Sequence, residues 1–398
     1  MTNMDKLYEA VEARGPVCVG LDTDFSYLPA DFVDSTLTKG ENIVRFNKKL
    51  IDATKAVAGC YKVQIAYYES LGMEGMKAYA DTLKAVREAG VPVIADIKRG
   101  DIDKTVEMYA MGHFTGDFES DFVTLAPYMG LDTDFSYLPA DFVDSTLSKG
   151  ENIVRFNKRL IDATKAVAGC YKVQIAYYES LGLDGMRAYA ETLKLARATG
   201  LPVIADIKRG DIAKTAEMYA KAHFTGDFEA DIITLAPYMG LDSISPYLPY
   251  CAEQGKGVFV LCRTSNPGAK DFEYKKLDDG RHVYDLVGDS LTALGKDYMG
   301  EHGYSSIGLV IGGTHTEEAT AIRAAYKDTF FLIPGYGAQG GKAADIAQYL
   351  TKGNGGVVNS SRGILLAYKK QPGVAFDEAA YNECVRMRED IQGECNKL

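Results

Sequence analysis

The chain has 398 residues, of which 46% are apolar and 25% charged, and its formal net charge is −11. This composition is typical of a globular protein with one large domain or two. The acidic balance argues against nucleic-acid binding, and no apolar run is long enough to span a membrane. The seven cysteines show no paired spacing, so we expect reduced thiols in a cytoplasmic protein.

Taken in chain order, predicted helices and strands alternate. The first part reads as helix 4–14, strand 16–22, helix 40–58, strand 60–68, helix 73–89, strand 91–96, helix 102–113 and strand 122–128. Residues from 131 onward repeat this series. After Gly240 follow strand 257–263, helix 283–299, strand 307–311, helix 316–326, strand 330–333, helix 342–352, strand 356–359 and a closing helical region. Such alternation predicts βαβ units and a parallel sheet.

A single long duplication dominates the chain. Residues 20–129 recur as residues 130–239, an offset of 110, and 18 of the 110 positions differ. A solenoid would have shorter and more numerous units. Counted once, the repeat and its lead-in contribute four strands, and the part after Gly240 contributes four more. Eight βα units in about 290 residues predict an α/β fold, a (β/α)8 TIM barrel with a duplicated half-barrel segment. A doubly wound open sheet is the alternative, but no Gly-x-Gly-x-x-Gly follows the first strand.

Only one copy can complete the barrel with the residues after 240. We expect residues 122–398 to form the complete barrel from the second copy (130–239) and residues 240–398, with residues 124–129 as its first strand. Residues 1–121 would then be a surplus N-terminal half-barrel.

In the other arrangement, residues 1–129 supply strands one to four and the second copy is looped out. In either case a lone half-barrel exposes apolar faces and strand edges. We therefore expect the surplus half to pair with its counterpart in another chain, or to exchange between chains.

One stretch with strong chemical character occurs in both copies. Val-Ile-Ala-Asp-Ile-Lys-Arg-Gly-Asp-Ile spans residues 93–102 and 203–212. Strand side chains alternate between faces, so Asp206 and Lys208 point to the same side, and Asp211 follows a glycine turn. The pattern predicts an acid, a base and an acid at the carboxyl end of a buried strand, where parallel barrels carry their chemistry. A surface salt-bridge cluster is the alternative interpretation.

Polar motifs also end other predicted strands. Gly-Leu-Asp ends the first strand, Tyr-Lys-Val-Gln lies on the second, and Arg-Thr-Ser-Asn-Pro-Gly-Ala follows the fifth. A lysine inside an apolar strand is uncommon because burying it unpaired is costly. The glycine-rich stretch 334–341 exposes backbone N–H groups to an anion at a helix N-terminus, and Asn-Ser-Ser-Arg-Gly (359–363) offers a guanidinium fork. Loops after the last two strands form the usual phosphate site of such barrels.

Together these motifs resemble the orotidine 5′-monophosphate decarboxylase family, in its bacterial branch with longer loops. The resemblance covers essentially the whole chain once the repeat is counted once. It implies decarboxylation of orotidine 5′-monophosphate to uridine 5′-monophosphate in de novo pyrimidine synthesis. It also implies a nucleotide substrate, no cofactor, no metal and a cytoplasmic homodimer.

The resemblance assigns catalytic roles to two equivalent sets, one in each copy: Lys208, Asp206, Asp211 and Lys172, or Lys98, Asp96, Asp101 and Lys62. The lysine that follows the first Asp of the motif would protonate C6 of the pyrimidine, and that Asp would lie beside the leaving carboxylate. The last Asp of the motif, with a nearby threonine, would reach into the partner subunit's site. The resemblance assigns substrate binding to Asp132 or Asp22 for the ribose, Thr215 or Thr105, Ser265 for the pyrimidine, and Gln339 and Arg362 for the phosphate.

Two other functions stay open. A metal-dependent sugar-phosphate lyase of the same barrel family shares Asp-x-Lys-x-x-Asp, but it carries an acid for the metal on the second strand, where this chain has Lys62 and Lys172. The five histidines show no metal-ligand spacing. The other alternative is a catalytically idle duplicated barrel, natural or engineered, that serves as a folding or assembly module.

Overall fold

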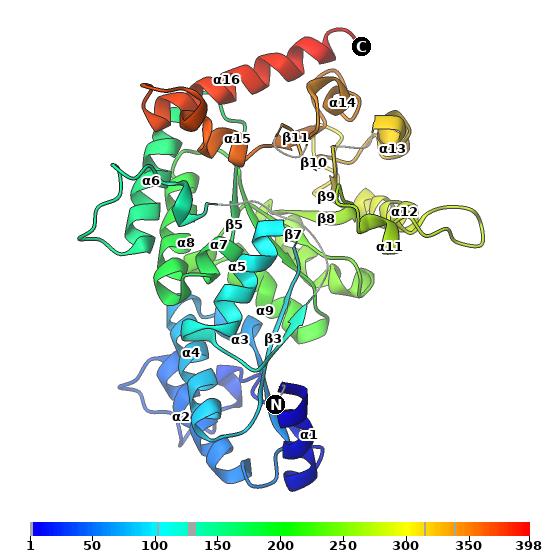
Figure 1. The fold of residues 1–398 in the computed structure, drawn as a ribbon. Helices are drawn as coiled ribbons and strands as arrows, with labels where there is room; N and C mark the ends of the chain where they lie inside the picture. Colours follow the sequence, from blue (N-terminus) through cyan, green and yellow to red (C-terminus); the bar gives the residue numbers. More distant parts are fainter. Residues whose placement is uncertain (1–2, 102, 126–132, 314–315, 338–339) are drawn as a thin grey trace.

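The computed structural model describes residues 3–101, 103–125, 133–313, 316–337 and 340–398. Figure 1 shows the N-terminal copy in blue to cyan, the second copy in green, and the part after the repeat in yellow to red. None of the described helices combines the length and apolarity that crossing a bilayer requires.

The described strands form two sheets in which all pairs are parallel. The first sheet has the order β1-β2-β3-β4, with β1 (Cys18–Gly20), β2 (Cys60–Gln64), β3 (Val93–Arg99) and β4 (Phe122–Leu125). The second sheet runs from β11 to β5 in unbroken order, with β5 (Tyr171–Gln174), β6 (Val203–Arg209), β7 (Ile232–Leu235), β8 (Gly257–Arg263), β9 (Ile307–Ile311), β10 (Phe331–Pro334) and β11 (Gly356–Asn359).

Helices connect these strands. The N-terminal copy and its lead-in contain α1 (Asn3–Arg14), α2 (Lys39–Thr54), α3 (Ile65–Glu69), α4 (Gly72–Glu88) and α5 (Asp103–Phe114). The second copy contains α6 (Lys149–Thr164), α7 (Ala176–Glu179), α8 (Gly182–Arg197) and α9 (Ala213–Phe224). After the repeat follow α10 (Leu248–Gln254), α11 (Ala269–Phe272), α12 (Val283–Gly295), α13 (Ala319–Ala325), α14 (Ala343–Ala347), α15 (Arg362–Leu365) and α16 (Phe376–Cys395).

The same local signals start the equivalent helices in both copies. The Thr38 hydroxyl accepts a hydrogen bond from the Glu41 backbone N–H at 3.2 Å, and the Glu41 carboxylate accepts from the Thr38 N–H at 2.8 Å. Ser148 and Glu151 form the same reciprocal pair at the start of α6. Such capping boxes satisfy backbone donors that the first helical turn leaves unpaired.

The strand predicted over residues 60–68 is wrong beyond Gln64. The Gln64 side chain accepts a hydrogen bond from the Ala66 backbone N–H at 3.2 Å and caps the short helix α3. The equivalent Gln174 accepts from the Ala176 N–H at 3.0 Å before α7. The apolar run continues through both elements, and periodicity alone cannot separate a buried strand from a short buried helix.

The second sheet is a nearly closed parallel barrel, which confirms the predicted TIM-barrel fold. Its interior holds buried side chains from successive strands, including Ile204, Phe259, Leu261, Val310 and Leu332. The two edge strands, β5 and β11, both line one cavity. Side chains that fill the inside of such a barrel make it a packed core.

The first sheet is a half-barrel of four strands. β4 (Phe122–Leu125) pairs with β3, so these residues lie with the N-terminal copy, just past the boundary expected at residue 122. The first strand expected for the complete barrel, residues 124–129, lies mostly outside the described residues. Ile94 in the half-barrel is only half-buried, whereas its repeat equivalent Ile204 is buried in the complete interior.

The C-terminal helix α16 docks on the second copy. Phe376 stacks on Phe156 of α6 with ring centroids 4.7 Å apart, and Phe142 packs edge-on against it at 4.9 Å. Arg159 donates to the Asp377 carboxylate at 3.0 and 2.5 Å. The N-terminal copy has Lys49 where the second copy has Arg159. Because a lysine cannot form this forked contact, the substitution favours the second copy as the seat of α16.

The two copies pack against each other through a buried ion cluster. Arg99 donates to Glu179 at 2.6 Å and to Glu69 at 2.8 Å, and Arg209 donates to Glu69 at 2.8 Å. All four side chains are fully buried. Burial raises the pKa of Glu69, but the positive charges of Arg209 and Arg99 outweigh it and lower this pKa to about 2.

We expect Phe156→Ala to lower the free energy of unfolding by about 3–5 kcal/mol, because Phe156 is fully buried against α16. The matched control is Phe46→Ala, which removes the same side chain from a half-buried position of the N-terminal copy. Urea unfolding of both variants checks this. Equal losses would contradict the docking of α16 on the second copy.

Acidification should destabilise the fold below about pH 6.5, the usual histidine pKa. Burial lowers the pKa of His113 and of His223 beside the ion cluster, so the unfolded chain binds more protons than the folded chain once the pH falls below about 6.5. The free energy of unfolding therefore falls as pH drops from 6.5 to 5. Glu69 contributes no slope there, because its stabilisation is lost only below its unfolded pKa of about 4.5.

The measurement is thermal unfolding from pH 7.5 to 5.0, with the His113→Gln/His223→Gln double variant as comparison. The variant should show a shallower dependence in this window. An unchanged slope would exclude these two histidines as its source.

Candidate functional site

The lysine at the end of β6 has an unusual backbone. Lys208 has φ 42°, in the left-handed region, and the pairing of β6 with β7 shifts register between Ala205 and Arg209. Lys98 repeats this at the end of β3 with φ 44°. Non-glycine residues rarely adopt this conformation, and it costs energy that the surroundings must offset.

A threonine on the neighbouring strand supports this bend. The Thr234 hydroxyl of β7 accepts hydrogen bonds from the backbone N–H groups of Ile207 at 3.0 Å and Lys208 at 2.9 Å. It donates to the Asp206 carboxylate at 2.9 Å. Thr234 is fully buried. It therefore fixes both the strained lysine and the carboxylate beside it.

Asp206 lies between two lysines. Its carboxylate accepts from Lys208 Nζ at 2.5 Å and also contacts Lys172 Nζ from β5. All three side chains are nearly completely buried. Burial raises the pKa of Asp206, but the charges of Lys172 and Lys208 outweigh it and lower this pKa to about 2. The carboxylate is therefore ionised at neutral pH.

A second carboxylate reaches this cluster from the other copy. Asp101, after β3, lies 3.5 Å from Lys208 Nζ, measured to Oδ2. It also accepts from the Gln174 side chain of β5 at 2.9 Å. We call Lys172, Asp206, Lys208 and Asp101 the second-copy cluster. Its members come from both halves of the chain although three of them belong to one barrel.

An equivalent group lies at the half-barrel. Lys98 is 2.7 Å from Asp96 and 2.7 Å from Asp211, which comes from the second copy. Lys62 is 3.0 Å from Asp96 and 2.9 Å from Asp22. We call these five residues the first-copy cluster. Burial lowers the pKa of Lys62, but its hydrogen bond and charge contacts with Asp22 and Asp96 outweigh it and raise this pKa.

The two clusters differ in their exposure. The Lys98 side chain is 22% exposed and that of Lys208 is 2% exposed. Lys62 is 31% exposed and Lys172 is 5% exposed. The strands after the repeat enclose only the second-copy cluster. A charge contact is stronger where water is excluded, so the same residue types interact more strongly there.

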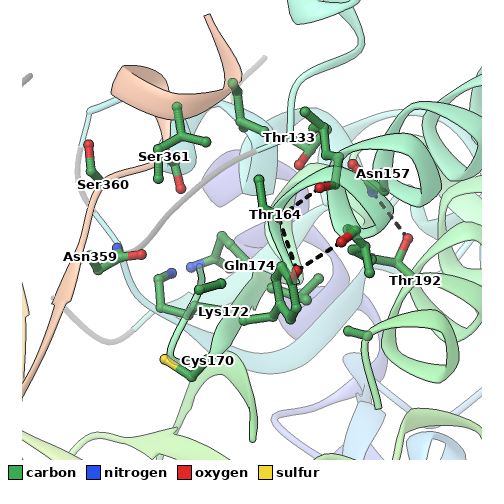
Figure 2. Close-up of a pocket in the computed structure, with 18 of the residues that line it drawn as sticks. Thr133, Asn157, Thr164, Cys170, Lys172, Gln174, Thr192, Asn359, Ser360 and Ser361 are labelled. Carbon is green, nitrogen blue, oxygen red and sulfur yellow. Dashed lines mark hydrogen bonds between the residues drawn. The ribbon is translucent and has the colours of Figure 1, made fainter. Parts of the chain in front are cut away.

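A cavity lies between one member of the second-copy cluster, Lys172, and the loop after β11 that is predicted to bind phosphate. Lys172 and Gln174 line it from β5, and Asn359, Ser360 and Ser361 line it from the end of β11. Figure 2 shows these two groups on facing sides of the cavity. The next residue along the chain is Arg362, the first residue of α15.

The remaining predicted binding residues are placed only in part. Asp132 and Gln339 lie outside the described residues. Ser265 is half-buried just after β8. Thr105 is buried, and Thr215 is half-buried on α9.

Sequence reasoning missed Thr234, Gln64 and Gln174. The two glutamines follow the lysine of Tyr-Lys-Val-Gln by two positions, so strand alternation places them on the same face. Strand alternation could therefore have identified both glutamines as residues near the clusters. The sequence gives no comparable signal for Thr234, because threonine is common in β-strands.

The fold and these clusters define a class of protein: a parallel α/β barrel enzyme with paired lysines and carboxylates at the carboxyl ends of its strands. The chain belongs to the orotidine 5′-phosphate decarboxylase / HUMPS family, whose sequence model matches residues 15–134 and 148–375.

Two relatives carry the name orotidine 5′-phosphate decarboxylase. The protein of Clostridium perfringens (strain SM101 / Type A) is 58% identical over 265 residues, covering 66% of this chain and 92% of the relative. That of Clostridium tetani (strain Massachusetts / E88) is 57% identical over 263 residues, covering 66% of this chain and 91% of the relative. Removing one 110-residue unit from 398 leaves 288 residues, and 265 residues at 92% coverage correspond to a relative of about 288. The relatives therefore match the chain with one copy removed.

Solved structures agree with the fold. OMP decarboxylase of Leishmania donovani is 33% identical with a TM-score of 0.50, covering 60% of this chain and 88% of that protein. UMP synthase of the same organism is 35% identical with a TM-score of 0.52, covering 61% of this chain and 51% of that protein.

We expect Thr234→Val to reduce turnover by on the order of tenfold, because the buried N–H groups of Ile207 and Lys208 lose their acceptor at a cost of about 1–3 kcal/mol. The repeat-equivalent Thr124→Val serves as the control. Steady-state kinetics of both variants with the proposed substrate check this. Equal effects would exclude a positioning role specific to Thr234.

Proposed function

We propose that the chain converts orotidine 5′-phosphate to uridine 5′-phosphate and carbon dioxide at the second-copy cluster. The observation that carries this proposal is the buried contact of 2.5 Å between Lys208 and Asp206, in a barrel where Ser360 and Ser361 line a cavity beside Lys172 and Arg362 follows them in the chain. Family membership and the named relatives support the choice of reaction.

The reaction needs a stabilised carbanion at C6 of the pyrimidine. The bond between C6 and the carboxylate carbon breaks, carbon dioxide leaves, and the electron pair stays on C6. The Lys208 ammonium stabilises the developing negative charge and donates its proton to C6, then regains a proton from solvent. Asp206 pairs with this ammonium and holds it in place, and Lys172 contacts the same Asp206 carboxylate.

The substrate phosphate would lie at the far end of the cavity. The Arg362 guanidinium offers two parallel donors to phosphate oxygens, and the serines before it add hydroxyl donors. Gln339 is proposed as a further phosphate ligand, Ser265 as the pyrimidine contact and Asp132 as the ribose contact. Binding energy from the phosphate would help to hold C6 beside Lys208.

The proposal also includes two predictions from the sequence: the division of the chain into two parts and its location in the cell. The chain divides into an N-terminal half-barrel and a barrel built from the second copy and the residues after it; the sheet pairing supports a boundary after β4 rather than at residue 122. A cytoplasmic location also stays a prediction. No described contact favours the metal-dependent alternative, because both strand-two lysines pair with carboxylates.

Lys208→Ala should lower kcat by on the order of 10² to 10⁴, because it removes the proton donor and the charge at C6. Lys98→Ala is the matched control and changes the equivalent lysine of the half-barrel. Loss of substrate absorbance, followed with and without excess chelator, measures the rate. A parent enzyme that is folded but inactive would overturn the proposal, and inhibition by chelator would favour the metal-dependent lyase.

A further inference from the structure

The contacts between the two copies repeat with their partners exchanged. Gln64 donates to Asp211 at 3.0 Å, and Gln174 donates to Asp101 at 2.9 Å. Each residue of the second pair is the repeat equivalent of a residue in the first, 110 positions away. In both contacts, the glutamine of one copy donates to the aspartate of the other copy, once in each direction.

The pattern extends across the interface. Asp227 accepts from the Met73 backbone N–H at 2.9 Å, and its equivalent Asp117 accepts from the Leu183 N–H at 3.0 Å. Helix α3 packs on α9, and α5 packs on α7. Arg99 binds Glu179 while Arg209 binds Glu69. Such reciprocity is the signature of a two-fold symmetric dimer interface, here formed inside one chain.

Covalent linkage favours this internal pairing. Joining two interacting surfaces by a short connection gives an effective concentration in the millimolar range. Two separate chains at micromolar concentration would compete poorly for the same surface. The resemblance predicts a homodimer, whereas the described contacts place the counterpart in the same chain.

The internal pairing is not functionally symmetric. The second-copy cluster lies in a barrel continued by β8 to β11, which carry Ser265 and Arg362 near their ends. The first-copy cluster lies in a sheet of four described strands, and its Lys98 is more exposed than Lys208. Only the second-copy cluster therefore faces a phosphate-binding half.

We propose that the N-terminal copy is a built-in partner that supplies Asp101 to the Lys208 site, so that one chain forms one productive site. Asp211 belongs to the first-copy cluster, where its described side-chain partners are Lys98 and Gln64. The productive site thus combines both copies of the same motif: Asp206 and Lys208 come from the second copy, and Asp101 comes from the first. This inference rests on the proposed decarboxylation.

The decisive comparison is Asp101→Asn against Asp211→Asn. Each change removes one charge, keeps the size of the side chain and lies at a repeat-equivalent position, so effects on folding should match. Asp101→Asn should lower kcat by on the order of 10² to 10³, the usual loss for one preorganised charged contact, while Asp211→Asn keeps most of the parent kcat. The reverse result would overturn the inference, because it would mean that the second copies of two chains pair and exchange Asp211.

Two further measurements separate pairing within the chain from pairing between chains. Light scattering of the parent should give a monomer, and its specific activity should not change on dilution. Lys208→Ala and Asp101→Asn chains, refolded together, should stay inactive because each lacks part of its only site. Recovery of activity in this mixture would show that copies exchange between chains and would overturn the inference.

The outcomes distinguish this inference from the proposed function. If the parent is active and Asp211→Asn is the damaging change, the decarboxylase assignment stands and the inference of an internal partner is rejected. A folded, monomeric parent without decarboxylase activity removes the proposed function while the internal pairing stands.

Discussion

Four charged side chains with no exposure to water hold the two copies together. Arg99 and Arg209 each contact both Glu69 and Glu179. Removing any one member would take one of two partners from buried charges that cannot reach water, at a cost of about 3–5 kcal/mol. The cluster therefore tolerates only arrangements in which both copies are present and correctly placed. Through this cluster, the N-terminal copy packs against the second copy.

The reactive clusters depend on that arrangement. Arg99 and Arg209 are the next residues after Lys98 and Lys208, so the anchoring arginines and the reactive lysines share one strand end. The bend that gives each lysine a positive φ lies beside a fully buried arginine of the ion cluster. Strain at a functional position persists where the surroundings over-determine it, and here the ion cluster and the Thr234 hydroxyl do so.

The two clusters differ in how far they are enclosed. Both copies carry the same lysine and carboxylates, yet only the second-copy cluster is closed off by the strands after the repeat. Excluding water strengthens a fixed ammonium as an electrostatic catalyst. The helix α16 contributes by seating on α6 through Phe376 and Asp377. One substitution between the copies, Lys49 against Arg159, thereby favours the second copy as the seat of α16.

The sequence by itself determined most of the elements, the barrel class and the residue types of the two clusters. Strands β8, β9 and β11 have the predicted bounds, and the Asp-x-Lys-x-x-Asp and Tyr-Lys-Val-Gln motifs lie at strand ends that meet. These features follow from local periodicity and from the parallel arrangement of strands. Only the tertiary structure decided that Asp101 approaches Lys208 and that Asp211 approaches Lys98. Two nearly identical copies give identical local signals, so the choice between them depends on long-range packing and on buried charges that no sequence window contains.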